Sequence, residues 1–254
     1  MITGAVRSKT FIEFEIKTGE LVQKHYNYAP KVFGKIKINI REGILYEFID
    51  GNNMSEEILK NPLKIRKFAQ LLAKLHVEMH KQRIPDIRSQ KAYFEQRIKG
   101  EQLLNKTQKQ IIINHLRNLE SGSILCHGDF HLENVLLSKK GPSVIDWSNL
   151  TAGNPHADIS RTLYILKHGH DPSSSERSSL LNFLINFFRF YFVKKYFRSY
   201  KRQAKVSLKQ VRKWNLIIYA VRLGEEIREE QDYLLKAINV EIKKLYHNKK
   251  NKAI

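Results

Sequence analysis

The first fifty residues alternate between apolar and polar positions, which is the period of a half-buried β-strand. Two such stretches, 11–16 and 21–24, flank a Thr-Gly pair, and this pattern predicts two strands joined by a tight turn. The alternation returns over residues 31–40 and continues in the short apolar stretch 44–49. We therefore expect a small β-rich unit at this end of the chain.

Beyond this unit the apolar positions recur at three- and four-residue spacing, which is typical of amphipathic helices. The spacing begins near Met54, and Pro62 suits the first turn of a second helix. Later stretches with the same spacing predict helices over about 90–99 and 107–119 and over most of 155–245. The larger part of the chain is therefore expected to be helical.

The middle of the chain returns to a strand-like pattern. Short apolar runs at 124–126, 135–137 and 143–145 predict three strands, and the Lys-Lys-Gly-Pro sequence between the last two predicts a hairpin turn. The whole pattern predicts an α+β fold with two lobes. The β-rich lobe would cover residues 1–50, and the helical lobe, with its embedded hairpin, would cover residues 51–254.

Composition narrows the class of protein. Of the 254 residues 42% are hydrophobic, which is enough to bury a core, and the single Cys126 excludes a disulfide framework and fits a reducing compartment. The most apolar stretch, 180–192, is interrupted by Asn182, Asn186 and Arg189, whereas a membrane helix needs ~20 mostly apolar residues. The first residues show no secretory signal. We expect a cytoplasmic protein with no membrane partner.

The charge is strongly positive, because 45 Lys and Arg residues against 25 Asp and Glu residues leave +20. A basic surface attracts polyanions such as nucleic acid. Here, however, the basic residues are spread along the chain, and the densest run, 247–252, lies at the C-terminal end of the sequence. The charge alone does not predict nucleic-acid binding, and we do not expect a nucleic-acid partner.

The most informative stretch is His-Gly-Asp-Phe-His-Leu-Glu-Asn at residues 127–134, which places five polar or titratable groups in eight residues between apolar strands. Such groups are costly to hold there without a use, although a hydrogen-bonded structural loop is the alternative. Asp129 and Asn134 have the D-x-x-x-x-N spacing of the catalytic loop in phosphoryl-transfer enzymes. Asp146, which ends the following hairpin, would bring a second carboxylate to the same place. Oxygen ligands of this kind suit Mg²⁺.

This stretch, together with Val-Ile-Asp-Trp at 144–147, resembles the signature of the aminoglycoside phosphotransferase and choline kinase family, which shares the protein-kinase-like fold. Gly-Asn-Pro at 153–155 resembles the segment that follows the metal-binding Asp in that family. Leu-x-x-Leu-His at 72–76 resembles one of its helices, and residues 46–51 resemble its interlobe hinge.

The resemblance implies a phosphotransferase that moves the γ-phosphate of ATP (or GTP) to a hydroxyl group of a small molecule. It implies that Asp129 accepts or orients the hydroxyl proton. It also implies that Asn134 and Asp146 hold Mg²⁺. The hydroxyl-bearing substrate and the nucleotide would be the protein's partners.

The same resemblance assigns residues to the nucleotide. The backbone of Glu47, Phe48 and Ile49, in the hinge, would meet the adenine. Lys24, at the end of the expected strand 21–24, is similar to the strand lysine that grips the nucleotide phosphates.

The N-terminal region departs from the family pattern. Residues 2–5 match a Gly-rich phosphate loop poorly, and only five residues separate Lys24 from Pro30. The family has a helix after this lysine, and its Glu pairs with the lysine, but five residues make less than two helical turns. A catalytically weak or inactive relative that serves as a binding protein is therefore the alternative to an active kinase.

A second alternative is a metal-dependent hydrolase. His127, Asp129, His131 and Glu133 alternate along the loop and are residue types that bind transition metals. No second His-rich cluster completes such a site, and a hydrolase would have no reason to keep Asn134 at its spacing from Asp129.

The acceptor substrate is not specified by the sequence. One dense acidic run lies in the helical part of the chain, where the family's acceptor pocket is lined: Glu225, Glu226, Glu229, Glu230 and Asp232. Such a run could bind a cationic acceptor, or it could be a solvated helix face that pairs with Arg222 and Arg228. The overall charge of +20 disfavours a polycationic acceptor at long range.

Overall fold

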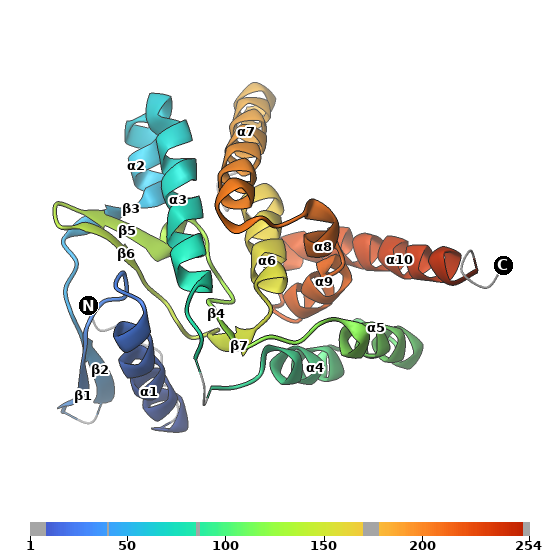
Figure 1. The fold of residues 1–254 in the computed structure, drawn as a ribbon, viewed down its shortest axis with the longest axis horizontal. Coiled ribbons are helices and arrows are strands. Elements are labelled where there is room, and N and C mark those ends of the chain that lie inside the picture. The colour runs from blue at the N-terminus through green and yellow to red at the C-terminus, as the bar shows by residue number, and fades with distance from the viewer. Residues whose placement is uncertain (1–8, 40, 85–86, 170–177, 251–254) are drawn as a thin grey trace.

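The computed structural model describes residues 9–39, 41–84, 87–169 and 178–250 (Figure 1). The elements of the first half are α1 (Lys9–His25), β1 (Val32–Ile38), β2 (Arg41–Tyr46), β3 (Gly51–Asn53), α2 (Met54–Lys60), the 3₁₀ turn η1 (Pro62–Lys64), α3 (Ile65–His80), α4 (Gln90–Gly100) and α5 (Lys106–Asn118). Those of the second half are β4 (Ile124–Cys126), the 3₁₀ turn η2 (Leu132–Asn134), β5 (Val135–Ser138), β6 (Gly141–Val144), β7 (Thr151–Gly153), α6 (Pro155–His168), α7 (Ser179–Ala204), α8 (Leu208–Arg212), α9 (Asn215–Leu223) and α10 (Arg228–Lys250). The expected α+β fold is confirmed, and residues 2–5 lie outside the described ranges.

The prediction of two strands over residues 11–24 is wrong, because these residues form the single helix α1. Its buried positions, including Ile12, Val22 and the following Tyr26, recur at helical rather than alternating spacing. Tyr26 donates its hydroxyl hydrogen to the carbonyl of Leu75 at 3.0 Å, which anchors the end of α1 on α3. Phe14 and Ile16, two of the apolar positions that suggested alternation, are half-buried side chains of this helix.

Gly19 explains why the Thr-Gly pair indicated a turn. It is a buried residue in the middle of α1, and a Cβ there would lie 2.4 Å from Cγ2 of Val32. The glycine therefore allows α1 to pack closely against β1. It does not reverse the chain.

Strands β1 and β2 form an antiparallel hairpin in which Lys35 faces Ile44, as the pattern over residues 31–49 predicted. Asn39 lies in the connecting turn with φ 55°, a left-handed conformation that asparagine tolerates. The chain then leaves β2 through the irregular segment 47–50. The amide of Glu47 in this segment donates to the carbonyl of Lys31 at 2.8 Å, so the segment is tied to the start of β1.

The embedded hairpin is confirmed as β5 and β6, with Val135 opposite Val144. It is joined on the β5 edge by β3, so that Gly51 faces Ser138 in a three-stranded sheet. A further pair, β4 and β7, forms a separate two-stranded sheet. Strands β3 and β7 were not predicted, because Gly-Asn-Asn and Thr-Ala-Gly contain no run of large apolar residues like that of β4.

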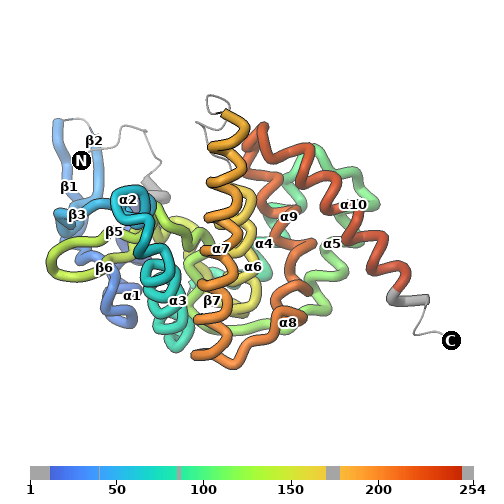
Figure 2. The backbone as a smooth tube through the Cα atoms, turned by 90° about the horizontal axis from the view of Figure 1, so that it is seen from above, coloured from blue at the N-terminus to red at the C-terminus, as the bar shows by residue number. Residues whose placement is uncertain are grey.

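The helices predicted from spacing are confirmed as α2 to α6 and α7 to α10, and they form the larger part of the molecule (Figure 2). Helix α3 packs along α7, and both bury side chains in a core that also receives Leu125, Phe130 and Val144 from the central loop and strands. A second core joins α4, α5, α9 and α10 around residues such as Ile98 and Ile217. The central loop 127–134 thus lies between a small sheet and the packed helices α3 and α7.

None of the helices within the described ranges is long and apolar enough to cross a membrane.

Candidate active site

The loop that carries Asp129 follows β4 and ends in the 3₁₀ turn η2. Gly128 has φ +78°, and a Cβ at this position would lie 2.4 Å from the backbone oxygen of Asn149. Only glycine fits there without strain. Next to Asp129, the Phe130 ring is fully buried and lies 4.4 Å from the ring of His76, which fixes the loop to α3.

Asp158, on the first turn of α6, holds the backbone of this loop. Its carboxylate accepts hydrogen bonds from the amides of His127 and Gly128, each at 2.8 Å. The buried His127 ring contacts the carbonyl of Ile145 through Nε2 at 3.0 Å. These contacts make His127 a structural member of the loop. Asp158 was not predicted as a site residue, although its segment resembles the family pattern.

Two histidines on α3 complete the partners of Asp158. The Nε2 atoms of His76 and His80 each lie 3.2 Å from Asp158 Oδ2, and their Nδ1 atoms face the hydroxyls of Tyr196 and Tyr200 at 2.6 and 2.7 Å. If each tyrosine donates to Nδ1 and each Nε2–H donates to the carboxylate, every polar atom in the cluster has a partner. The four-residue spacing of the two histidines was the sequence signal for this cluster.

Burial and hydrogen bonding set the charges in this cluster. Desolvation, with a smaller contribution from the neighbouring His80, lowers the pKa of His76 to about 3, so this ring is neutral at physiological pH. Burial also opposes ionisation of Asp158, but the hydrogen bonds from the two histidines outweigh it and hold the pKa of Asp158 well below its usual value. The cluster therefore holds an ionised carboxylate next to the neutral ring of His76.

Asp129 is the partly exposed carboxylate of the loop. Its Oδ1 accepts from Nη2 of Arg161 at 2.9 Å, and its Oδ2 lies 3.4 Å from Nε2 of His131. Burial raises the pKa of Asp129, but His131 and Arg161 together lower it further than burial raises it. The carboxylate is therefore ionised, as an acceptor of a hydroxyl proton must be. Arg161 was not predicted as a member of the site.

Arg161 connects Asp129 to the acidic run. Its Nη1 lies 2.6 Å from Glu225, which also contacts Nη1 of Arg222 at 2.7 Å. Arg222 in turn makes two hydrogen bonds to Glu230, at 2.7 and 2.8 Å, and the Tyr164 hydroxyl donates to Glu230 at 2.8 Å. Burial would lower the pKa of Arg161, but Glu225 and Asp129 raise it.

This network shows what two residues of the acidic run contact. Arg222 pairs with Glu225 and Glu230, as one of the two interpretations expected, but Glu230 is buried and does not lie on a solvated face. Glu225 is nevertheless bound to the arginine that touches Asp129. These two carboxylates belong to an alternating chain of charges behind Asp129.

The two expected metal ligands lie at the open end of the hairpin. The Nδ2 atom of Asn134 donates to the backbone oxygen of Asp129 at 2.9 Å, which leaves Oδ1 of the amide as the atom for a cation. The carbonyl of Asn134 accepts from the amide of Ile145 at 3.0 Å, so the hairpin ladder brings Asp146 close to the catalytic loop. Asp146 is exposed, has φ 60° and accepts from the Ser148 hydroxyl at 2.7 Å.

The residues expected to bind the nucleotide differ in how they are placed. Glu47, Phe48 and Ile49 form the irregular hinge that follows β2, and Phe48 is highly exposed. The amide of Glu47 is occupied by Lys31, so an adenine would have to use the remaining backbone groups. Lys24 is an exposed residue in the last turn of α1. Its assignment rested on a strand that does not exist, and we withdraw it.

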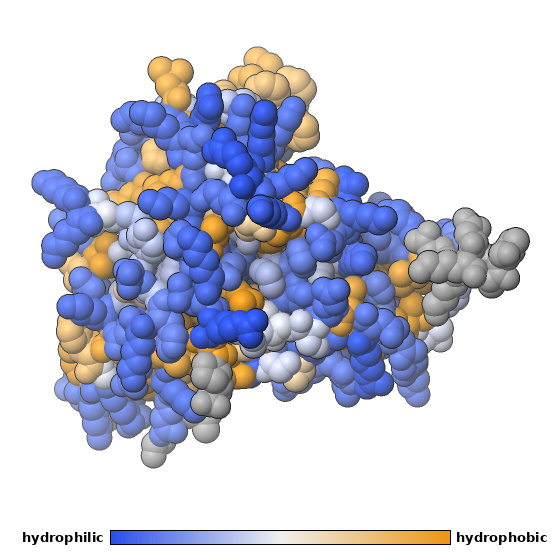
Figure 3. Space-filling model, viewed as in Figure 1, coloured by the Kyte–Doolittle hydropathy of each residue, from blue (hydrophilic) through white to orange (hydrophobic). Residues whose placement is uncertain are grey.

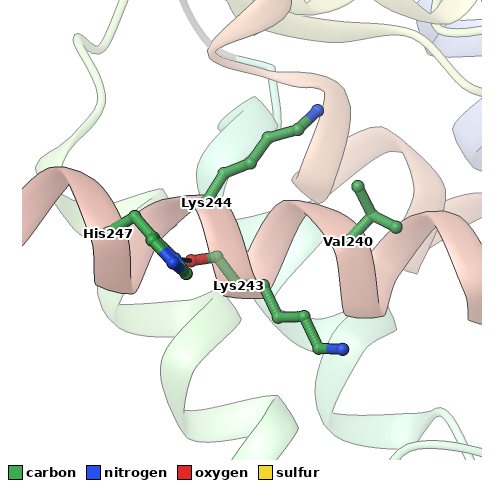
Figure 4. A pocket seen from close by; sticks show the side chains of 4 residues that line it. All are labelled: Val240, Lys243, Lys244 and His247. Atoms are coloured by element: carbon green, nitrogen blue, oxygen red, sulfur yellow. Dashed lines mark hydrogen bonds between the residues drawn. The ribbon is translucent and has the colours of Figure 1, made fainter.

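Other features of the described residues do not form a competing site. The one group of three or more potential metal ligands found there is His76, His80 and Asp158, so the expected hydrolase set around Asp129 is not assembled. A surface hollow on α10 is lined by Val240, Lys243, Lys244 and His247 (Figure 4). All four come from one helix, and the His247 ring is bonded to the carbonyl of Lys243 at 3.0 Å. This hollow is not part of the catalytic loop.

Comparisons with known proteins agree with this fold. The structure is similar to that of a thermostable mutant of aminoglycoside phosphotransferase APH(4)-Ia in a ternary complex with AMP-PNP and hygromycin B, with a TM-score of 0.62 and 11% sequence identity over 90% of this chain and 82% of that chain. It is also similar to an amicoumacin kinase in complex with AMP-PNP, Ca²⁺ and Ami (TM-score 0.58, 15% identity, 93% of this chain and 78% of that chain). An aminoglycoside-3'-phosphotransferase of type VIII gives a TM-score of 0.57 at 16% identity, with 84% of this chain and 80% of that chain covered.

At these identities the structural likeness establishes the protein-kinase-like fold alone. No curated protein sequence matches the chain. The sequence profile of the phosphotransferase enzyme family, however, matches residues 4–192, which span the hinge, the catalytic loop, the hairpin and α6. The chain therefore belongs to the phosphotransferase enzyme family.

Proposed function

We propose that this protein transfers the γ-phosphate of ATP, or of GTP, to a hydroxyl group of a small molecule, with Asp129 as the catalytic residue. The observation that carries the proposal is the ionised Asp129 carboxylate, which Arg161 and His131 hold on the loop that also carries Asn134, whose Nδ2 donates to the Asp129 carbonyl. Phosphoryl transfer requires little covalent chemistry from the protein, so positioned charges of this kind account for most of what it needs.

In this reaction the acceptor hydroxyl oxygen forms a bond to the γ-phosphorus, and the bond between that phosphorus and the β,γ-bridging oxygen breaks. The nucleoside diphosphate leaves with the bond electrons, and the hydroxyl proton passes to Asp129. A carboxylate of lowered pKa is a weak base, so it accepts the proton only once the new bond has made the hydroxyl acidic. Before that step Asp129 orients the hydroxyl through a hydrogen bond.

The residues at the end of the hairpin fit Mg²⁺. Asn134 offers its Oδ1 because its Nδ2 is engaged by Asp129, and Asp146 offers a carboxylate from an exposed position. Hard oxygen ligands in small number are what Mg²⁺ uses at nucleotide phosphates. When bound, Mg²⁺ would neutralise charge on the phosphates.

We propose that the nucleotide lies between two lobes that meet at the hinge, residues 1–50 and 51–254, with the adenine against the backbone of Glu47, Phe48 and Ile49. α1 ends at His25, and no helix lies between Lys24 and Pro30, as expected. Because Lys24 lies in the last turn of α1 and not on a strand, we assign no lysine to the phosphates. A weakly active relative that binds nucleotide therefore stays the second candidate.

Glu225 lies behind Asp129, on the other side of the buried Arg161. Because this glutamate is already paired with two arginines, it offers no unpaired carboxylate to a cationic acceptor. We therefore propose a hydroxyl-bearing metabolite, without further specifying its class.

Calorimetric titration with ATP and GTP, in the presence and absence of Mg²⁺, tests the proposal. A kinase should bind nucleotide more tightly with Mg²⁺, and Asp129→Asn should keep this affinity while lowering turnover by ~10²–10⁴ on any accepted hydroxyl compound. An inactive relative would bind nucleotide without metal dependence or would not bind it. An equal loss of binding and turnover in Asp129→Asn would mean that Asp129 is structural.

A further inference from the structure

The first three turns of α7 present apolar side chains to solvent. Leu180, Phe183 and Phe187 are 70%, 67% and 57% exposed, and further exposed members of the same segment are Leu181, Leu184, Phe188 and Phe190. The N-terminal end of α7 extends from the helical body, with apolar surface over it (Figure 3). Seven exposed large apolar residues within eleven positions are far more than the isolated ones that any protein surface carries.

Two polar residues of this segment are on its less exposed side, whereas Asn186 is exposed. Asn182 and Arg189 are only half-exposed, and Arg189 donates to the carbonyl of Gly169 at 2.6 Å. A surface helix in a soluble protein normally turns its apolar side inward. Here the orientation is reversed, so the apolar side is available to something outside the described chain.

A second apolar point lies at the same end of the molecule. His76 and His80 of α3 contact Tyr196 and Tyr200 of α7 in the same order, so the two helices run parallel and begin at the same end. Just before α3, Leu63 is 99% exposed, and Leu59 in α2 is 82% exposed. We call this surface, formed by Leu59, Leu63 and the seven exposed residues of α7, the apolar end.

Most charges next to the apolar end are basic, although Glu56 and Glu57 of α2 lie close to Leu59 in the sequence. Helix α7 contains no acidic residue, and its basic residues nearest the apolar end are Arg189, Lys194 and Lys195. Beside Leu63, three exposed basic residues follow one another closely, Lys64, Arg66 and Lys67. Exposed Phe and Leu side chains flanked by Lys and Arg are the composition of segments that lie in the interface of an anionic membrane.

We propose that the apolar end docks onto an anionic lipid surface. The Phe and Leu side chains would enter the boundary between headgroups and acyl chains, while the neighbouring lysines and arginines would meet the lipid phosphates and carboxylates. Two copies of this chain, each with net charge +20, would repel each other, which disfavours a second copy as the occupant. The mode is peripheral, since no described helix could cross the bilayer. This replaces the expectation of no membrane partner.

Co-sedimentation of the full chain with vesicles of neutral phosphatidylcholine, and with vesicles that contain 30% phosphatidylserine (about the content of an anionic leaflet), tests the proposal. We expect binding to the anionic vesicles that weakens as salt is raised. The double variant Phe183→Ser, Phe187→Ser should bind at least ~10-fold more weakly, because two large apolar side chains no longer enter the interface. The matched control Val240→Ser, Tyr246→Ser removes exposed apolar residues of α10 and should leave vesicle binding unchanged.

Three outcomes would overturn the proposal. The first is no binding to anionic vesicles. The second is binding that the α7 variant does not weaken, because the attraction would then be that of surface charge alone. The third is a dimer, seen by light scattering, that the α7 variant converts to a monomer without any vesicle binding, because the apolar end would then be a contact between copies. Unchanged melting temperatures of both variants would show that the comparison is between folded proteins.

Discussion

Arg161 donates a hydrogen bond to Asp129 across 2.9 Å, from a guanidinium that is almost completely buried. The same guanidinium is held on its other side by Glu225 at 2.6 Å, so the arginine is fixed between two carboxylates. A buried arginine clamped in this way can neither move away from Asp129 nor lose its proton. The pair therefore fixes both the position and the charge of the carboxylate that we propose for catalysis.

Removing this arginine should change the pH dependence of the reaction. Burial favours the protonated form of Asp129, and His131 and Arg161 outweigh it to lower the pKa. Activity that needs the ionised carboxylate is therefore retained to low pH in the parent protein. In Arg161→Met the pKa of Asp129 should rise, so the acid limb of kcat/KM should move up by about 1–3 pH units. Arg161→Lys keeps the positive charge, so its acid limb should lie at a lower pH than the acid limb of Arg161→Met. An acid limb at the same pH in the parent and both variants would contradict this role of Arg161.

Asp146 should be essential for the metal response but not for folding. Both Asp146→Asn and Asp146→Ala should abolish the tightening of nucleotide binding by Mg²⁺, measured by calorimetry, because a carboxylate ligand is lost. The residue has φ 60°, which asparagine tolerates and alanine does not. The Ala variant should therefore also lose about 1–2 kcal/mol of unfolding free energy in the absence of ligand. Retained Mg²⁺ dependence in Asp146→Asn would remove Asp146 from the metal site.

Lys24→Ala should leave nucleotide binding unchanged. The side chain is exposed in the last turn of α1, where a cation interacts with the helix dipole for about 0.3–1 kcal/mol. A small loss of unfolding free energy is therefore expected, and no loss of affinity for Mg-ATP in calorimetry. A loss of affinity above ~3 kcal/mol, the scale of a strong charged hydrogen bond, would restore Lys24 as a phosphate ligand.

Gly19→Ala should destabilise the protein, although alanine is the better helix former. Its Cβ would lie 2.4 Å from Cγ2 of Val32, so α1 and β1 would have to separate. Overpacking of this kind costs about 1–3 kcal/mol, which urea unfolding would detect as a lower midpoint. Gly100→Ala, at the end of α4, meets nothing within 4 Å and is the matched control. Equal midpoints for the two variants would show that the close packing at Gly19 is not needed.

The contrast between α1 and the embedded hairpin shows what the sequence could predict. The hairpin was predicted because Val135 and Val144 belong to short apolar runs separated by Lys-Lys-Gly-Pro, a purely local signal. The turn itself is formed by Lys139 and Lys140, and Gly141 and Pro142 belong to β6. In α1 the local signal was misleading. The pattern indicated a turn at Gly19, but glycine is needed there because the residue packs closely against Val32, thirteen positions later in the chain. A contact between two elements leaves no mark in the pattern of either one alone.

The same limit applied to the site. Asp129, Asn134 and Asp146 were predicted because they share one short motif, and the structure brings the loop and the hairpin end together through the bond between Asn134 and Ile145. Arg161 lies 32 positions after Asp129 in the chain. The spacing of apolar residues predicted the helix that carries Arg161, but it did not predict which residues of that helix face the loop. Glu225 is further away still. Buried ion pairs between distant segments depend on packing, so they appear only in the folded structure.

The neutral His76 should make the protein acid-sensitive over a defined range. Burial lowers its pKa to about 3, whereas an unfolded chain binds this proton at about 6.5. Between these values the unfolded state holds more protons, so the free energy of unfolding should fall as the pH falls, by up to ~1.4 kcal/mol per pH unit for this group. His76→Gln keeps a donor for Asp158 but cannot take up a proton, so its unfolding free energy should depend less steeply on pH between 6.5 and 4.

The control is Tyr196→Phe, which removes the hydroxyl next to Nδ1 of His76 and keeps the titratable ring. It should lower the unfolding free energy at every pH without changing the slope of that energy against pH. Parallel curves for the parent and His76→Gln in urea unfolding would show that this histidine does not set the acid limit.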